Sequence, residues 1–103
     1  MKHYYLHLTN SKFYISDQTV NAIIRMLKGI DSSIKISRGK ENGWAIYFDS
    51  DIEFNIFNEA IKKFIIEKKY EYTQYKLLVM KNSKFGISEN FVHIIPFEKF
   101  NIN

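Results

Sequence analysis

The order of hydrophobic patterns along the chain constrains its fold more than any other feature. Apolar residues alternate with polar ones in segments 3–9, 33–37, 44–48 and 75–81, as in half-buried strands. Segments 17–29 and 51–69 instead repeat apolar residues at i, i+3, i+4 and i+7, as in amphipathic helices. The chain therefore reads as strand, helix, strand, strand, helix, strand within about eighty residues.

This order is that of the ferredoxin-like β-α-β-β-α-β fold, an α+β arrangement in which two helices cover one face of an antiparallel sheet. Residues Phe91 to Phe97 predict an extra C-terminal strand, and Pro96 marks it as an edge strand because proline cannot donate a ladder hydrogen bond. A chain of 103 residues without a linker or repeat predicts one domain spanning 1–103. The residues expected in the core include Ile23, Leu27, Trp44, Ile46, Phe48, Phe57 and Ile61.

Five local signals predict where the elements begin and end. Ser16 or Asp17 can cap the first helix, and Gly29 is expected to stop it in a left-handed conformation, with Ile30 folding back. Segment 39–43 is expected to form a hairpin turn with glycine at positive φ. The sequence from Ser50 to Glu53 predicts a capping box at the start of the second helix. Segment 82–86 reads as a turn.

Composition excludes several classes of protein. The chain has no cysteine, so a disulfide framework, a thiolate zinc site and a thiol nucleophile are excluded. No apolar run approaches the roughly 18 residues of a membrane span, so we expect a soluble protein of the bacterial cytoplasm, without a membrane partner. Thirteen lysines accompany only two arginines, and isoleucine, asparagine, phenylalanine and tyrosine abound. These residues have A/T-rich codons, so the net charge of +4 indicates an AT-rich genome as much as an acidic partner.

Residues that could carry catalysis or bind a metal have simpler explanations. On a strand, His3 and His7 lie about 13 Å apart and cannot share one ion. Asp49, Asp51 and Glu53 lie at a strand-to-helix junction, where carboxylates stabilise the helix dipole. We therefore predict no catalytic residue, no metal site and no cofactor. A small phosphate- or nucleotide-handling enzyme is the third hypothesis, and the missing catalytic motif counts against it.

One face of the predicted sheet carries aromatic and basic residues. If Tyr4, Leu6 and Leu8 face the helices, then alternation places His3, Tyr5, His7 and Tyr47 on the open face, with Lys35 and Lys76 beside them. Rings surrounded by cations on central strands suit stacking of single-stranded nucleic acid. In element order over residues 3 to 81 the chain resembles the RNA-recognition motif, which implies RNA binding through this face. The alternative is that the C-terminal segment or a second subunit covers it.

The leading hypothesis is a non-enzymatic protein-binding module. In general character the chain is similar to accessory proteins of phages and mobile elements, among them anti-CRISPR inhibitors that occupy a surface of a bacterial nucleic-acid-processing effector. The alternative is an RNA or single-stranded DNA binding protein that uses the open face, and a homodimer is compatible with either. The residues predicted to bind the partner are Tyr5, His7, Lys35, Arg38, Lys40 and Tyr47.

Overall fold

The computed structural model describes residues 1–40, 43–80, 91–94 and 98–99, the last two segments by their backbone alone. Their elements follow one another in the order expected from the patterns, with one additional short strand at the end. They are β1 (Lys2–Asn10), α1 (Asp17–Ile30), β2 (Ile36–Lys40), β3 (Trp44–Ser50), α2 (Phe54–Glu67), β4 (Thr73–Met80), β5 (Phe91–Ile94) and β6 (Glu98–Lys99).

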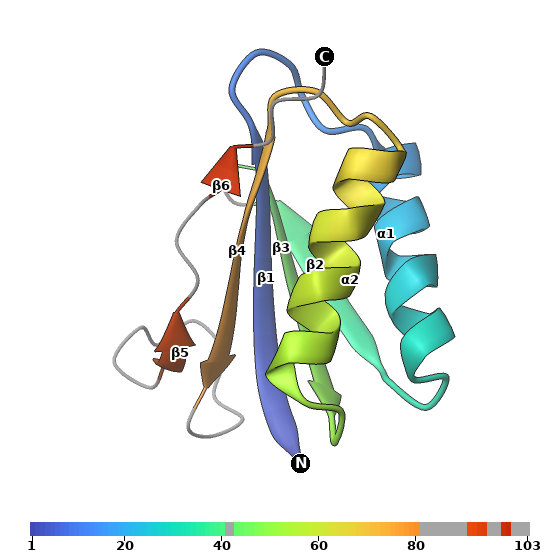
Figure 1. The fold of residues 1–103 in the computed structure, drawn as a ribbon, viewed down its shortest axis with the longest axis vertical. Coiled ribbons are helices and arrows are strands. Elements are labelled where there is room, and N and C mark those ends of the chain that lie inside the picture. Colours follow the sequence, from blue (N-terminus) through green and yellow to red (C-terminus); the bar gives the residue numbers. More distant parts are fainter. Residues whose placement is uncertain (41–42, 81–90, 95–97, 100–103) are drawn as a thin grey trace.

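The strands form one antiparallel sheet, and both helices lie on the same side of it (Figure 1). The strand order is β2-β3-β1-β4-β5, and β6 also pairs with β4. Tyr4 of the central strand β1 lies opposite Phe48 on one side and Val79 on the other. An α+β class with four antiparallel strands and two helices is thus confirmed. Of the helices in the described residues, none is long and apolar enough to span a membrane.

The core lies between the sheet and the two helices. Alternation along β1 places Tyr4, Leu6 and Leu8 on the helix side, where each is fully buried. Helical spacing turns the matching apolar stripes of α1 and α2 toward them. The seven core residues predicted from the sequence are all buried: Ile23, Leu27, Trp44, Ile46, Phe48, Phe57 and Ile61.

The start of α1 is as predicted, but its end is not. The Ser16 hydroxyl accepts a hydrogen bond from the backbone N–H of Thr19 (3.2 Å). Gly29 lies inside the last turn and has no left-handed backbone, so its expected role as the stop is wrong. The helix continues to Ile30, which packs against the core, and Asp31 ends it. Burial of Ile30 extends the helix beyond the glycine.

The predicted capping box does not form. Ser50 is the last residue of β3, and its buried hydroxyl donates to Asp31 Oδ2 (2.6 Å) and accepts from the Ile52 N–H (3.1 Å). Hydrogen bonds from Ser33 and then from Ser50 hold the pKa of Asp31 below its ordinary value. Glu53 occupies the N-cap of α2 without a side-chain hydrogen bond to the helix. The box fails because α2 begins only at Phe54, so that Glu53 rather than Ser50 lies at its N-cap.

In the hairpin between β2 and β3, only one of the two glycines has a backbone conformation that favours glycine. Gly43 has φ of +118°, as predicted, whereas Gly39 lies within β2 opposite Ala45. At the C-terminal end, β5 pairs with β4 at the outer edge of the sheet, so the extra strand is present over 91–94. Pro96 and the predicted turn at 82–86 lie outside the described residues.

Candidate interaction surface

The acidic junction after β3 is explained by ion pairs with the start of β1. Each of its three carboxylates has a cationic or imidazole partner. Within the described part of the chain, no group of three or more histidine or acidic side chains could hold a metal ion. The pairs are His3 Nδ1 with Asp49 (2.7 Å), the Met1 amino group with Asp51 (3.3 Å) and Lys2 Nζ with Glu53 (3.1 Å).

Three of the predicted partner-binding residues gather on the open face of the sheet. Tyr5 lies directly opposite Tyr47 in the register of β1 and β3. Their ring centroids are 4.9 Å apart at an interplanar angle of 60°, and the His7 ring lies 6.0 Å from that of Tyr5. Lys76 lies opposite His7 on β4. The sequence thus correctly placed this cluster, but its rings pack edge to face rather than lying as parallel platforms.

The same face also contains buried apolar residues. Ala45, Leu78 and Met80 point away from the helices by their register, yet each is only 2–3% exposed. The aromatic side chains Tyr5 and Tyr47 are themselves only partly exposed. This face therefore has an apolar layer of its own rather than a fully solvated surface.

Arg38 and Lys40 do not share a surface with Tyr5 and Tyr47. Alternation along β2 directs them to the helix side, where both lie over the ring of Trp44. Arg38 also donates a hydrogen bond to the Asn21 side chain of α1. Lys35 is exposed just before β2. Strand parity thus places the hairpin cations and the open-face tyrosines on opposite faces of the sheet, and their joint use in partner binding stays a prediction.

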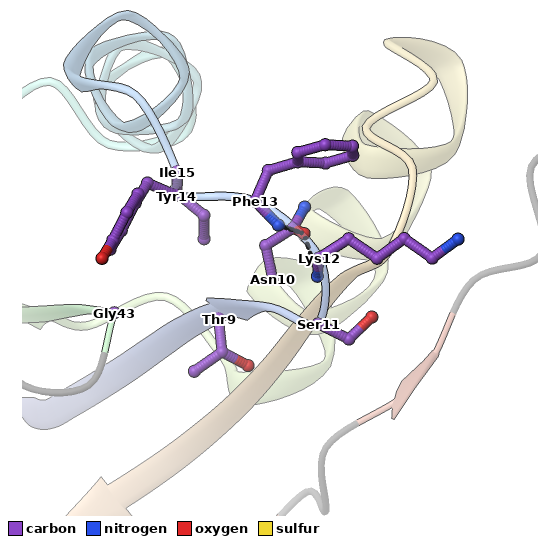
Figure 2. Close-up of a pocket in the computed structure, with 8 residues that line it drawn as sticks. All are labelled: Thr9, Asn10, Ser11, Lys12, Phe13, Tyr14, Ile15 and Gly43. Carbon is purple, nitrogen blue, oxygen red and sulfur yellow. Dashed lines mark hydrogen bonds between the residues drawn. The ribbon is translucent and has the colours of Figure 1, made fainter.

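The loop between β1 and α1 is the most exposed apolar feature among the described residues. Asn10 organises it: its Oδ1 accepts from the backbone N–H of Lys12 (2.9 Å) and of Phe13 (2.7 Å), the dashed lines of Figure 2. The Asn10 Nδ2 group donates to the Glu71 carbonyl (2.9 Å), which ties this loop to the segment before β4. Tyr14 extends toward Gly43, whereas Lys12 and Phe13 extend to the other side (Figure 2).

A third aromatic residue joins this loop from the segment between α2 and β4. Tyr72 lies 6.4 Å from Phe13, ring centroid to centroid, and the Lys12 ammonium lies 4.2 Å from the Tyr72 centroid. Tyr72 has φ of +62°, a conformation unusual for an aromatic residue. Its carbonyl accepts from the Ser11 N–H (3.1 Å), so the loop fixes this backbone. We call Lys12, Phe13, Tyr14 and Tyr72 the aromatic end.

Two hollows flank the aromatic end. The larger, of about 580 Å³, runs along segment 9–15 and reaches Gly43 (Figure 2). The smaller, of about 360 Å³, lies between the same loop and the segment of Lys69 to Glu71. Phe13 and Tyr14 line both of them. Side chains of a partner could therefore enter on either side of the loop.

The sequence interpretation missed the aromatic end altogether. One feature of the sequence could have indicated it. Phe13 and Tyr14 lie in the connection between a strand and a helix, and neither belongs to the apolar repeat of either element. The contribution of Tyr72 depends on tertiary structure and has no signal nearby in sequence. Comparisons with protein-family models, with curated proteins and with solved structures found no match to this chain.

Proposed function

We propose that this protein is a non-enzymatic binding module that recognises another protein through its aromatic end. One observation carries the proposal: three large rings that contribute little to the core gather at one end of the molecule. The exposed fractions of Phe13, Tyr14 and Tyr72 are 67%, 102% and 40%. Aromatic anchors of this kind supply much of the binding energy at protein interfaces, where tyrosine and tryptophan are enriched.

The aromatic end is also held in place before any partner arrives. Asn10 bonds the backbone of its own loop and the Glu71 carbonyl, while Ser11 bonds the Tyr72 carbonyl. A loop that is ordered in advance loses less conformational entropy on binding. The left-handed backbone of Tyr72 has a cost in stability, which is typical of residues retained for function.

The narrower proposals concern fold and biological role. Read from β4, the strand order β4-β1-β3-β2 with antiparallel neighbours supports a ferredoxin-like assignment. We propose further that the partner is a bacterial nucleic-acid-processing effector, which the protein inhibits in the manner of an anti-CRISPR protein. This proposal is supported by the small size of the chain, its lack of cysteine and its many residues with A/T-rich codons.

The second candidate function is binding of RNA or single-stranded DNA through the open face. The gathering of Tyr5, His7 and Tyr47 on the two central strands favours it. The edge-to-face contact of the two tyrosine rings disfavours it, since bases stack on exposed ring faces. Nucleic-acid binding would weaken by roughly one power of salt concentration per phosphate contact. An apolar protein interface would be far less sensitive to salt.

Affinity purification from the host after nuclease treatment tests the proposal. The double variant Phe13→Ser, Tyr14→Ser should lose the proteins that the unaltered chain retains, because it removes both anchors without touching the core. The matched control is Ile56→Ser, Ile66→Ser, which removes two other exposed apolar side chains from α2. Circular dichroism checks that both variants fold.

The outcome also separates the two functions. Retention of the same proteins by the Phe13, Tyr14 variant would reject the aromatic end as the working surface. Loss of binding only in Tyr5→Ala, Tyr47→Ala, together with a steep salt dependence, would support the open-face hypothesis instead.

A further inference from the structure

Two cations lie over the single tryptophan of the chain. Arg38 and Lys40 are alternate residues of β2 and so point to the same side of the sheet. The Arg38 guanidinium carbon lies 5.4 Å, and the Lys40 ammonium 5.2 Å, from the centroid of the Trp44 ring. Cation–π contact therefore holds both charges close to one ring.

The groups around this ring are fixed in position. Trp44 is 8% exposed, and its Nε1–H donates to the Ile15 carbonyl (3.0 Å). Arg38 is held from a second direction by its hydrogen bond to Asn21. A guanidinium has five N–H donors, so this bond leaves others to grip a planar acceptor. The side chain that would bind an anion is thus already ordered.

The charge of this pair is not offset within the described residues. No carboxylate among them forms an ion pair with Arg38 or Lys40, although the acidic junction after β3 is fully paired. Side chains two residues apart on a strand start only about 6.6 Å from one another. Two like charges at this spacing repel each other, and an anion bound to both would relieve that repulsion.

We infer that Arg38, Lys40 and Trp44 form a receptor for a carboxylate side chain of the protein partner, an inference that rests on the proposed function. The receptor adjoins the aromatic end, because the carbonyl that binds Trp44 belongs to Ile15, the residue after Tyr14. The partner segment should accordingly carry a glutamate or aspartate close to apolar residues. The acid binds the cations, and the apolar side chains contact Phe13 and Tyr14.

The Trp44 ring beneath these two cations favours a protein carboxylate over the phosphates of a nucleic acid. Nucleic-acid strands bind where successive bases can stack on exposed ring faces along a basic track. Here Lys12 already lies over the Tyr72 ring, and two cations lie over Trp44. These cations would have to leave before a base could stack on either of those two rings. A carboxylate can bind to Arg38 and Lys40 without displacing them from the Trp44 ring.

Trp44 supplies the measurement, since a change in the fluorescence of the only tryptophan reports on the receptor directly. The probes are a short poly-glutamate peptide, a poly-glutamine peptide of equal length, oligothymidylate and inorganic phosphate, all at one ionic strength. We expect saturable binding of poly-glutamate that is at least about tenfold tighter than binding of the other three. Calorimetry provides a second reading that does not depend on fluorescence.

Variants separate this receptor from general basicity. Arg38→Ala, Lys40→Ala should weaken poly-glutamate binding by at least about tenfold. The control Lys28→Ala, Lys63→Ala removes the same charge from exposed helix positions and should bind like the unaltered chain. Asn21→Ala keeps both cations but releases Arg38, so it should weaken binding to a smaller degree. Glu41→Gln removes the carboxylate nearest in sequence and should bind at least as tightly as the unaltered chain.

Three results would overturn the inference. The first is equal binding of the glutamate and glutamine peptides. The second is an equal loss of poly-glutamate affinity in Arg38→Ala, Lys40→Ala and in Lys28→Ala, Lys63→Ala. The third is tighter binding of oligothymidylate than of poly-glutamate. Failure here is distinct from failure of the proposed function. The peptide titration tests the receptor alone, whereas partner capture by the Phe13, Tyr14 variant tests the aromatic end.

Discussion

At the scale of single residues, buried polar groups of this protein are joined by specific hydrogen bonds. The Tyr75 hydroxyl donates to Asn58 Oδ1 in the interior, and the Tyr4 hydroxyl donates to the Ile52 carbonyl (2.6 Å). Among the described residues, no buried side-chain nitrogen or oxygen lacks a partner. Burial, and then the negative charge of Glu53, raise the pKa of Tyr4 to about 12 from its ordinary value of 10.0.

Tyr4→Phe should lower the free energy of unfolding at neutral pH by about 1 kcal/mol, because the Ile52 carbonyl loses its donor. The same variant should change the response to alkali. Since the folded pKa of Tyr4 is raised, its contribution to stability is complete below pH 10.0 and is lost as the pH rises toward about 12. The variant should therefore lose less stability than the unaltered chain across that interval.

Urea unfolding at neutral pH and at several alkaline values measures both effects. Tyr14→Phe is the control, since that ring is fully exposed and its variant should match the unaltered chain throughout. Identical alkaline slopes for Tyr4→Phe and the unaltered chain would contradict the assigned pKa.

At the scale of elements, sequence patterns located the strands and helices well and their ends less well. The apolar repeats of β1 and α2 predict which residues are buried, because each of these elements buries one face against the core. Where a helix begins or ends also depends on contacts with residues distant in sequence. Ser50 bonds Asp31 and α2 begins only at Phe54, so no capping box forms, and packing of Ile30 carries α1 past Gly29. Such contacts leave no periodic signal in the chain.

The hairpin between β2 and β3 gives a paired prediction at this scale. Gly43→Ala should lower the free energy of unfolding by more than about 1 kcal/mol, because residues with a Cβ rarely adopt its φ of +118°. A Cβ there would also lie 2.1 Å from the Leu8 carbonyl oxygen. Gly39→Ala should be tolerated or slightly stabilising, since nothing lies within 4 Å of its Cβ position. Chemical unfolding of the two variants, compared side by side, is the measurement, and equal losses would contradict the described hairpin.

At the scale of the whole molecule, the main core lies between the sheet and the helices, and a few apolar residues are buried on the opposite face. The alternation of β1 and β3 was enough to predict the cluster of Tyr5, His7 and Tyr47. It could not reveal the aromatic end, since Tyr72 reaches Phe13 only after two segments distant in sequence are joined. Nor did the interpretation of the hairpin as a single basic tip anticipate that Arg38 and Lys40 lie over Trp44.

Phe57 tests the layered arrangement as a whole. It is fully buried between α2 and the sheet, with its ring 5.0 Å from those of Tyr4 and Phe48. Phe57→Ala should lower the free energy of unfolding by about 3–5 kcal/mol through lost burial and a residual cavity. Phe13→Ala makes the same chemical change at a 67% exposed position and should alter stability by less than about 1 kcal/mol. Equal effects in thermal unfolding would refute this helix orientation.

The amino terminus and the aromatic end lie at opposite ends of β1 (Figure 1). A tether, dye or sensor chip attached before Met1 would therefore display Phe13 and Tyr14 outward, with the attachment on the far side. The linkage would convert the Met1 amine into an amide and abolish its pairing with the exposed Asp51, at little cost because such pairs contribute little. Immobilisation through this terminus provides oriented presentation for kinetic measurements of partner binding.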